Sequence, residues 1–376
     1  MKHNAFKRAA AVLTAAAAAV TIAAVPAMAD AEGFDDVPAT HWAYDSVLYC
    51  QEQGVVNGVG SGEFAPDAVL TKAEFIVMVG RAALGADVQT LDGDTWYSAY
   101  VRALAEGGCL DGIAVDDAAL GSAVTREEMA LILFAVCSAA DDYLTNGDWS
   151  DALAGAADAA DMDALSAAAA AYCVYTGLLS CGEDGSFSPA ATVTRADGCA
   201  AAARAICWLN TADTSRGVAL SLGVSEDALA QVVSALVVER INAYREAQGL
   251  TAFEELEIMN SACEVRAEEL SVSFTHTRPD ESARATVYAE LFGAELLTNE
   301  TITKVRDSLD FDDTPAELAD TMLTEWTTDD NSTLIGSEAN SYIGCGVYFT
   351  ETRVYCAVQY TDEANLTAAG IALNEQ

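Results

Sequence analysis

Residues 54–75, GVVNGVGSGEFAPDAVLTKAEF, carry the pattern that decides the fold of the first half of the chain. A glycine-rich segment, typical of a loop, leads into Thr-Lys-Ala-Glu at 71–74, and an apolar stretch follows. Threonine followed three residues later by glutamate is a capping box, in which the hydroxyl accepts from one helix amide and the carboxylate accepts from another. The stretch therefore predicts a loop that ends in a capped helix.

The tetrad of threonine, cation, any residue and acid occurs twice more, at 125–128 and 194–197. A glycine lies at the same distance before each threonine, and Phe64 and Pro66 of the first copy recur as Phe187 and Pro189 of the third. Such self-similarity is the mark of a repeat architecture. We predict three helix–loop–helix repeats, at 33–85, 90–141 and 147–210.

Capping explains the threonine and the acid of each tetrad but not the cation, because a positive charge opposes the helix dipole in the first turn. A cation beside the amides of a helix N-terminus is instead typical of an anion-binding site. We therefore predict that Lys72, Arg126 and Arg195 bind anions.

Phe34-Asp35-Asp36-Val37, His41-Trp42-Ala43 and the glycine-rich segment resemble an S-layer homology repeat, and the resemblance covers residues 33–210. It implies a mainly α-helical, pseudo-threefold unit whose grooves bind an anionic secondary cell-wall polysaccharide or peptidoglycan. Lysine at 72 keeps the charge of the family's arginine but loses its bidentate fork. The opening aspartate corresponds to Asp36 and, through Trp149-Ser150-Asp151, to Asp151. The expected polysaccharide-binding residues are Lys72, Arg126, Arg195, Asp36, Asp151 and Trp42.

Two details of these repeats stay open at the sequence level. The second repeat lacks the phenylalanine and proline, and the third carries an alanine-rich insertion, so at most two of the three grooves are expected to bind. Trp42 is expected either to stack on a sugar ring or to lie in the core, and the core is the favoured alternative.

The first 29 residues are typical of a secretory signal, with Lys2, Lys7 and Arg8 before an apolar stretch that ends in Ala27-Met28-Ala29. We expect cleavage there, no lipid anchor and no membrane insertion afterwards, with an uncleaved anchor as the alternative. The formal net charge of −40 repels nucleic acid and anionic lipid. We therefore expect a secreted protein of the bacterial cell wall or cell surface, and no nucleic-acid partner.

The second half predicts an α+β sandwich, because helical spacing comes first and antiparallel strands come last. Residues 211–226 have no strong period and are expected to be a linker. The predicted domain covers 227–362 and includes a capping box at 314–317 that starts a helix ending near Trp326. Residues 363–376 are expected to be a tail.

The last two strands form a predicted hairpin, 342–349 and 352–360, in which Cys345 is opposite Cys356. An exported protein is exposed to oxidising conditions, so a disulfide between these cysteines is one expectation and a pair of buried thiols is the other. Eight further cysteines cannot be paired from sequence, and none forms a CxxC motif of the kind that binds zinc.

Five motifs in order resemble a bacterial CAP domain, the group that includes plant pathogenesis-related class 1 proteins and venom allergens. They are INAYREAQGL at 241–250, FTHTRPD at 274–280, GAELL at 293–297, the helix ending at Trp326, and YIGCGVYF at 342–349.

The resemblance implies a cleft that in some members binds a divalent metal through two histidines and two glutamates. The expected cleft residues here are His276, Arg278, Glu295 and Glu325. Asn331 or Ser332 stands where the second histidine would fall, and His276 is the domain's single imidazole. We expect no metal and no cofactor.

The leading hypothesis is a non-enzymatic surface protein, anchored to wall polysaccharide, whose CAP-type domain binds an unknown lipid or peptide ligand. One alternative is a wall-bound hydrolase that uses His276 and Glu295, with a serine or cysteine such as Ser271, Ser273 or Cys263 activated by the histidine. The non-catalytic interpretation of the same residues is that His276 and Arg278 form a polar network that braces the cleft. Another alternative is a structural S-layer subunit.

Overall fold

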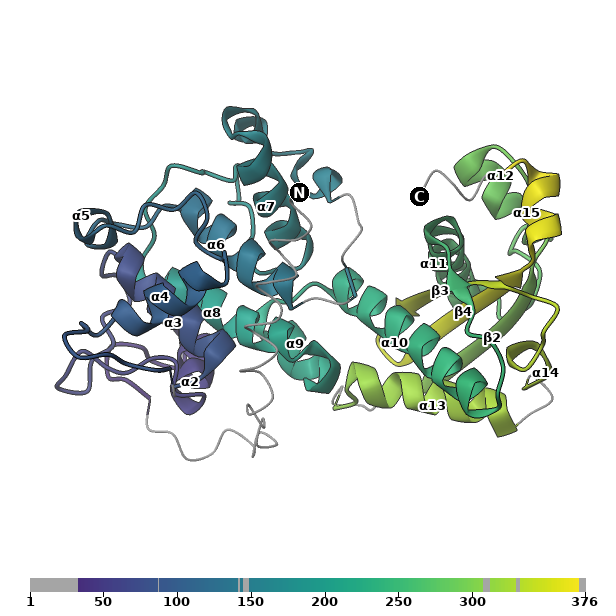
Figure 1. The fold of residues 1–376 in the computed structure, drawn as a ribbon, viewed down its shortest axis with the longest axis horizontal. Helices are drawn as coiled ribbons and strands as arrows, with labels where there is room; N and C mark the ends of the chain where they lie inside the picture. The colour runs from purple at the N-terminus through teal and green to yellow at the C-terminus, as the bar shows by residue number, and fades with distance from the viewer. Residues whose placement is uncertain are drawn as a thin grey trace. The chain divides into compact units, whose positions relative to one another are not determined.

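A computed structural model describes residues 33–86, 88–140, 143–144, 149–306, 312–328 and 332–371. The expected signal segment at 1–29, Asn331, the side chain of Ser332 and residues 372–376 lie outside the described part. The chain divides into two compact units, which are taken in turn (Figure 1).

The first unit is helical. Three of its helices begin directly after the tetrad threonines: α3 (Lys72–Leu84), α6 (Arg126–Ala139) and α8 (Arg195–Leu209). The remaining elements are α2 (Tyr44–Glu52), α4 (Ser98–Glu106), α5 (Asp117–Leu120), the short 3-10 helices η1 (Ser150–Leu153) and η2 (Ala157–Asp161), and α7 (Ala164–Tyr175).

All three predicted capping boxes are confirmed. Thr71, Thr125 and Thr194 each accept from the amide three residues on, and the acid of each tetrad accepts from the threonine amide in return. The three helix starts are joined in a closed ring, because isolated β-bridges connect the segment before each helix to the segments before the other two. These bridges pair Val69 with Thr194, Thr71 with Ala123, and Thr125 with Thr192.

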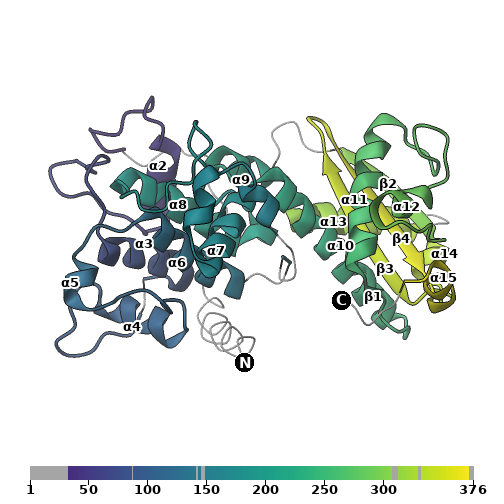
Figure 2. The same ribbon diagram turned by 90° about the horizontal axis from the view of Figure 1, so that it is seen from above.

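The second unit contains a four-stranded sheet with helices on both faces (Figure 2). Its strands are β1 (Glu254–Glu255), β2 (Asn299–Arg306), β3 (Tyr342–Phe349) and β4 (Arg353–Thr361), in the order β1-β3-β4-β2. The long helices are α10 (Glu226–Ala247), α11 (Glu257–Val272) and α13 (Pro315–Thr328). The short ones are η3 (Thr211–Asp213), α12 (Thr286–Phe292), α14 (Ser332–Ile335) and α15 (Glu363–Ala369). The boundary between the two units falls within α9 (Arg216–Leu222).

Alternate residues of a strand face opposite sides of a sheet, and the side-chain contacts identify which helices cover each side. Glu300 of β2 pairs with Arg266 of α11, whereas Thr303 of the same strand donates to Glu325 of α13. The helix α11 therefore covers one face, and α13 packs with α10 on the other.

Two expectations about the ends of the second domain differ from the structure. The expected linker at 211–226 is largely helical, with Thr211–Val218 in the second unit and Ala219–Ser225 in the first. The expected tail begins with α15, and Leu366 of that helix is buried in a core cluster with Leu256 and Met259. The helices that lie wholly within these segments have seven residues or fewer, which is too short to show a helical period in the sequence.

The predicted hairpin is present, but its register is wrong by two residues. Cys345 pairs with Val358 and Cys356 with Val347, because the turn is centred on 351 and 352. The two cysteines are diagonal neighbours instead of opposite neighbours. Their sulfurs lie 3.6 Å apart as two buried thiols, so the second of the two alternatives is the one the structure shows.

Among the described residues, no helix combines the length and the apolar composition needed to cross a membrane.

Glycines at 344 and 346 allow α11 to pack directly on β3. A Cβ built at Gly346 would lie 2.1 Å from the carbonyl carbon of Cys263, and one at Gly344 would lie 2.3 Å from the Cβ of Met259. No side chain fits at this distance, so the close approach of helix and strand depends on both glycines.

We expect Gly346→Ala to lower the free energy of unfolding by about 2 kcal/mol, because the added methyl group overpacks the layer between α11 and β3. Denaturant unfolding of the full chain measures this. Gly155→Ala is the control, since a Cβ there meets no atom within 4 Å. Equal stability of the two variants would contradict the packing argument.

Candidate functional site

Arg195, the first residue of α8, extends from the third repeat into the loop of the first. Its Nε donates to the carbonyl of Phe64 at 3.0 Å, and its Nη2 donates to the carbonyl of Asn57 at 2.8 Å. The guanidinium lies over the Phe64 ring, 4.8 Å from its centre, and Glu74 is 3.7 Å from Nη1. Neutral carbonyls and an aromatic face therefore fix the side chain, and Glu74 is its one ion-pair partner among the described residues.

Arg126, the first residue of α6, makes the matching contacts between the second and third repeats. Its Nε donates to the carbonyl of Phe187 at 2.7 Å, its Nη2 donates to that of Ser180 at 2.6 Å, and the Phe187 ring lies 4.9 Å away. Within the described part of the chain, no carboxylate pairs with this guanidinium. Its positive charge is therefore held in place but not cancelled.

Lys72, the third cation, is in a different environment. Its Nζ forms a 2.6 Å ion pair with Glu128 and donates to the carbonyl of Ala114 at 3.5 Å. Only 4% of the side chain is exposed. A solvent anion would have to displace Glu128, so this groove is closed to the role expected for Lys72.

Asp36 holds the loop on which Arg195 rests. Its carboxylate accepts from the amides of Phe64 and Ala65, both at 2.7 Å. Ala65 has a φ of 60°, a left-handed conformation that is strained for a residue with a side chain. Burial acts to raise the pKa of Asp36, but the two donated amide bonds outweigh it and hold the pKa below its usual value.

Asp158, not Asp151, has this role in the third repeat. Asp158 accepts from the amides of Phe187 and Ser188 at 2.9 and 2.6 Å, and Ser188 has a φ of 57°. These bonds lower the pKa of Asp158. Asp151 is exposed in η1, so its sequence-based assignment is wrong, because the alanine-rich insertion shifts the motif. The spacing to the phenylalanine identifies the right residue: 28 residues separate Asp36 from Phe64, and 29 separate Asp158 from Phe187.

Trp42 is 63% exposed, which makes the core alternative wrong. It stacks on His41, whose ring centre is 5.8 Å away.

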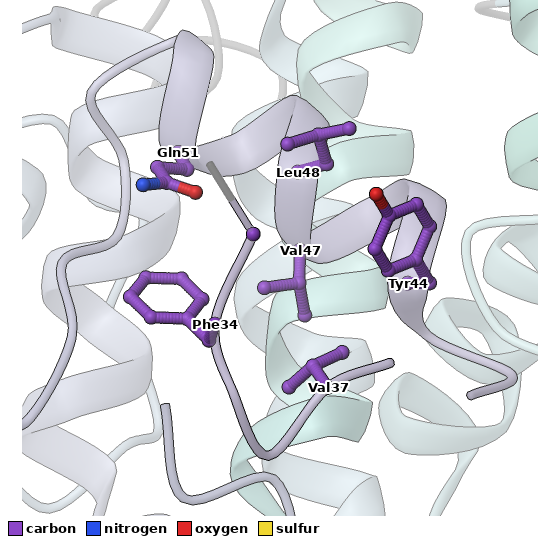
Figure 3. Close-up of a pocket in the computed structure, with 7 residues that line it drawn as sticks. Phe34, Val37, Tyr44, Val47, Leu48 and Gln51 are labelled. Carbon is purple, nitrogen blue, oxygen red and sulfur yellow. The ribbon is translucent and has the colours of Figure 1, made fainter. Parts of the chain in front are cut away.

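A shallow apolar hollow, with no enclosed space for a water molecule, lies beside the loop that Arg195 contacts (Figure 3). Phe34 lines it, and the Phe34 ring packs 5.4 Å from that of Phe64. The other lining residues are Gly33, Val37, Tyr44, Val47, Leu48 and Gln51. No charged side chain lines this hollow, so it offers no ionic partner for an anion.

We expect Asp158→Asn to lower the Tm at neutral pH, because the variant loses the charge-assisted bonds that hold Ser188 in its left-handed conformation. The pKa of Asp158 is lowered in the folded state, so its contribution is present above the unfolded value near 4 and is lost as pH falls through the folded value. The Tm difference between wild type and variant should therefore narrow in acid. Thermal unfolding from pH 7 to pH 2 measures it, with Asp151→Asn as the control, which should leave the Tm unchanged.

In the second unit, the partner of His276 is Glu300 and not Glu295. The Nδ1 of His276 lies 3.0 Å from Glu300 Oε2, and 57% of the histidine side chain is exposed. Glu300 is fully buried, and it also accepts from Arg266 Nε and Gln359 Nε2 at 3.1 Å each. Glu295 is exposed in the loop before β2, where no described contact links it to His276.

Arg278 continues this network. It pairs with Glu290 and with Glu269, which also pairs with Arg266. These contacts raise the pKa of Arg278, with the Glu290 bond as the largest cause. His276 and Arg278 are therefore joined through acids and Arg266 in a polar network, as the structural reading expected.

Glu325 does not share this site. It accepts from Thr303 on the opposite face of the sheet, so the sheet separates it from His276. The expected set of four cleft residues is wrong in Glu295 and Glu325. Glu300 was missed because no strand was predicted at 299–306.

Two of the three candidate nucleophiles, Ser271 and Cys263, are hydrogen-bonded to backbone carbonyls and not to His276. Ser271 Oγ donates to the carbonyl of Glu268, and the buried Cys263 Sγ donates to that of Gly344. Burial raises the pKa of Cys263 well above its usual value, which disfavours the reactive thiolate. Within the described residues, no group of three or more histidine, cysteine or acidic side chains is arranged to hold a metal ion.

We expect Glu300→Gln to lower the free energy of unfolding by about 3 kcal/mol, because it leaves the buried Arg266 without its main counter-charge. Denaturant unfolding measures the loss. Glu295→Gln removes the same charge from an exposed loop and should be neutral. A similar loss in both variants would show that the network does not depend on Glu300.

The family model for the S-layer homology domain matches residues 33–76 and 157–197, within the first and third repeats. Several curated proteins are similar over part of the chain. S-layer protein sap of Bacillus anthracis is 33% identical over 30% of this chain and 14% of its own length, and an endoglucanase of Bacillus sp. (strain KSM-635) is 31% identical over 30% and 12%. A cellulosome-anchoring protein of Acetivibrio thermocellus is 32% identical over 21% and 20%. The chain thus spans a small part of the length of these relatives.

Two solved structures show a weak likeness. An outer surface protein from Borrelia burgdorferi has 12% identity and a TM-score of 0.29 over 34% of this chain and 92% of its own. An extracellular protein containing a SCP domain from Bacillus anthracis str. Ames has 12% identity and a TM-score of 0.30 over 37% and 44%. At these values neither likeness establishes a shared fold.

The family match and the related S-layer proteins agree with the capped helices and closed ring of the first unit. This chain contains S-layer homology repeats, and it is a protein of the cell wall or cell surface.

Proposed function

We propose that the three repeats anchor the protein to an anionic cell-wall polysaccharide at the grooves of Arg126 and Arg195, and that they display the second unit at the surface. The observation that carries the proposal is the contrast among the three tetrad cations. Two guanidinium groups are fixed by neutral carbonyls, Arg126 with no carboxylate partner among the described residues and Arg195 with Glu74 at 3.7 Å. Lys72 is instead buried in a 2.6 Å ion pair. A guanidinium that carbonyls hold in place is suited to carboxylate or phosphate recognition.

The relatives support an anchoring role for the shared segment. Their names describe S-layer proteins, an endoglucanase and a cellulosome-anchoring protein, yet each of these is similar to this chain over a segment of only 89 to 118 residues. A segment that recurs in proteins of such different roles is best explained by a shared means of attachment.

For the second unit we propose a CAP-type binding domain that is not a hydrolase. The Nδ1 of His276 is bonded to Glu300, and Arg266 and Gln359 also bond this carboxylate. Such a network braces the loop at 274–280. The ligand remains a lipid or a peptide in this proposal, with a wall-bound hydrolase as the alternative that turnover assays would reveal.

The anchoring proposal predicts that the mature chain sediments with isolated cell-wall sacculi and that Arg126→Gln with Arg195→Gln abolishes sedimentation. Both arginines supply the charge that the polymer binds, so the bound fraction of wild type should also fall with added salt. Lys72→Gln should leave sedimentation intact, because that groove is closed. Circular dichroism checks that the double variant is folded.

Arg102→Gln with Arg240→Gln is the control, since it removes the same charge at two surface ion pairs elsewhere. A folded Arg126/Arg195 double variant that still sediments would overturn the proposal. Loss of sedimentation in the control would attribute binding to overall charge.

A further inference from the structure

The face of the sheet that α11 covers has a second polar feature beyond the His276 network. Lys304 of β2 pairs with Tyr355 of β4, which pairs with Tyr348 of β3, so these residues form one row across three strands. They lie on the α11 face by strand alternation, and Lys304 Nζ is 4.3 Å from the centre of the Phe274 ring. Phe274 in turn packs on Tyr355.

Phe274 and Tyr348 are each 36% exposed, and Tyr355 is partly exposed. The row is therefore an aromatic surface beside a cation, in the part of the face beyond the covering helix. Aromatic rings in this setting offer flat faces that a ligand can stack on.

Arg306 and Arg353 lie directly opposite each other at the end of the same two strands, and both are exposed. Like charges that face each other across a ladder destabilise it. Within the described residues no carboxylate pairs with either arginine, and Glu351 in the neighbouring turn is exposed. A local conflict of this kind is typical of a functional surface rather than of a structural one.

We infer that Lys304, Arg306, Arg353, Phe274, Tyr348 and Tyr355 form a binding surface for an anionic glycan. The sugar rings would stack on the aromatic side chains, and carboxylate or phosphate groups of the glycan would pair with the three cations. This surface goes beyond the proposed anchoring function, because it gives the displayed unit its own contact with the wall, independent of Arg126 and Arg195.

Charge complementarity favours a polymer strand over a membrane. The chain carries a net charge of −40, so a broad anionic bilayer meets repulsion from the whole molecule. A single strand approaches only the patch, and salt screens more distant charges within about 8 Å at physiological ionic strength. Two of the three rings carry hydroxyls, which suit a wet, hydrogen-bonding ligand better than acyl chains.

The test uses the full mature chain with Arg126→Gln and Arg195→Gln already in place, so that the repeats contribute no binding. The probe is oligogalacturonate, in which each sugar ring carries a carboxylate. We expect Arg306→Gln with Arg353→Gln to weaken binding about tenfold in calorimetric titration. The same variant should keep or raise the Tm, because it removes the opposed charges, so lost binding does not reflect unfolding.

Arg102→Gln with Arg240→Gln, in the same background, is the matched control and should leave the affinity unchanged. Tyr348→Ser should weaken binding of oligogalacturonate but not of polyglutamate, which has carboxylates and no sugar rings. Equal effects of patch and control variants, an equal effect of Tyr348→Ser on both polymers, or tighter binding to phosphatidylglycerol vesicles would each overturn the inference. Failure of the anchoring proposal is separate, because it concerns sacculi binding by Arg126 and Arg195.

Discussion

The first amides of an α-helix have no hydrogen-bond acceptor within the helix. The architecture of the first unit depends on the acceptors that these amides of α3, α6 and α8 bond instead. In each tetrad the acid takes the threonine amide and the threonine hydroxyl takes the amide three residues on. The amide of the cation residue donates to a neighbouring repeat: Lys72 to Ser122, Arg126 to Ala191, and Arg195 to Ala68. The same few bonds therefore end three loops, start three helices and close the ring.

The groove at Lys72 differs from the other two in the loop that it faces. Glu127 and Ala196 donate their amides to Pro189 and Pro66, the prolines of the loops that Asp158 and Asp36 hold. The second repeat lacks that proline, and α3, which faces it, has a lysine where the others have arginine. In that groove Lys72 donates to one carbonyl, that of Ala114, and pairs with Glu128, whereas each arginine donates to two carbonyls.

Local, repeated chemistry could be predicted from the sequence, and contacts between distant segments could not. The capping boxes depend on residues three apart, so Thr71 and its two equivalents were identified correctly. The partners of Arg195 lie 131 and 138 residues away, and no local pattern encodes them. Glu300 was missed because its strand, β2, pairs with β4, about 50 residues later in the chain. No neighbouring segment of the sequence therefore marked 299–306 as a strand.

The placement of cations follows from the acidity of the chain. With 58 acids against 18 lysines and arginines, a cation left beside a carboxylate is neutralised, and Arg266, Arg278 and Lys72 all bond acids. A cation that is not neutralised must lie away from acids. Arg126 is held by backbone carbonyls instead of a carboxylate, and strand pairing places Arg306 and Arg353 opposite each other. The net negative charge of the chain repels an anionic polymer at long range. Recognition of such a polymer must therefore depend on local groups of cations that act within a Debye length.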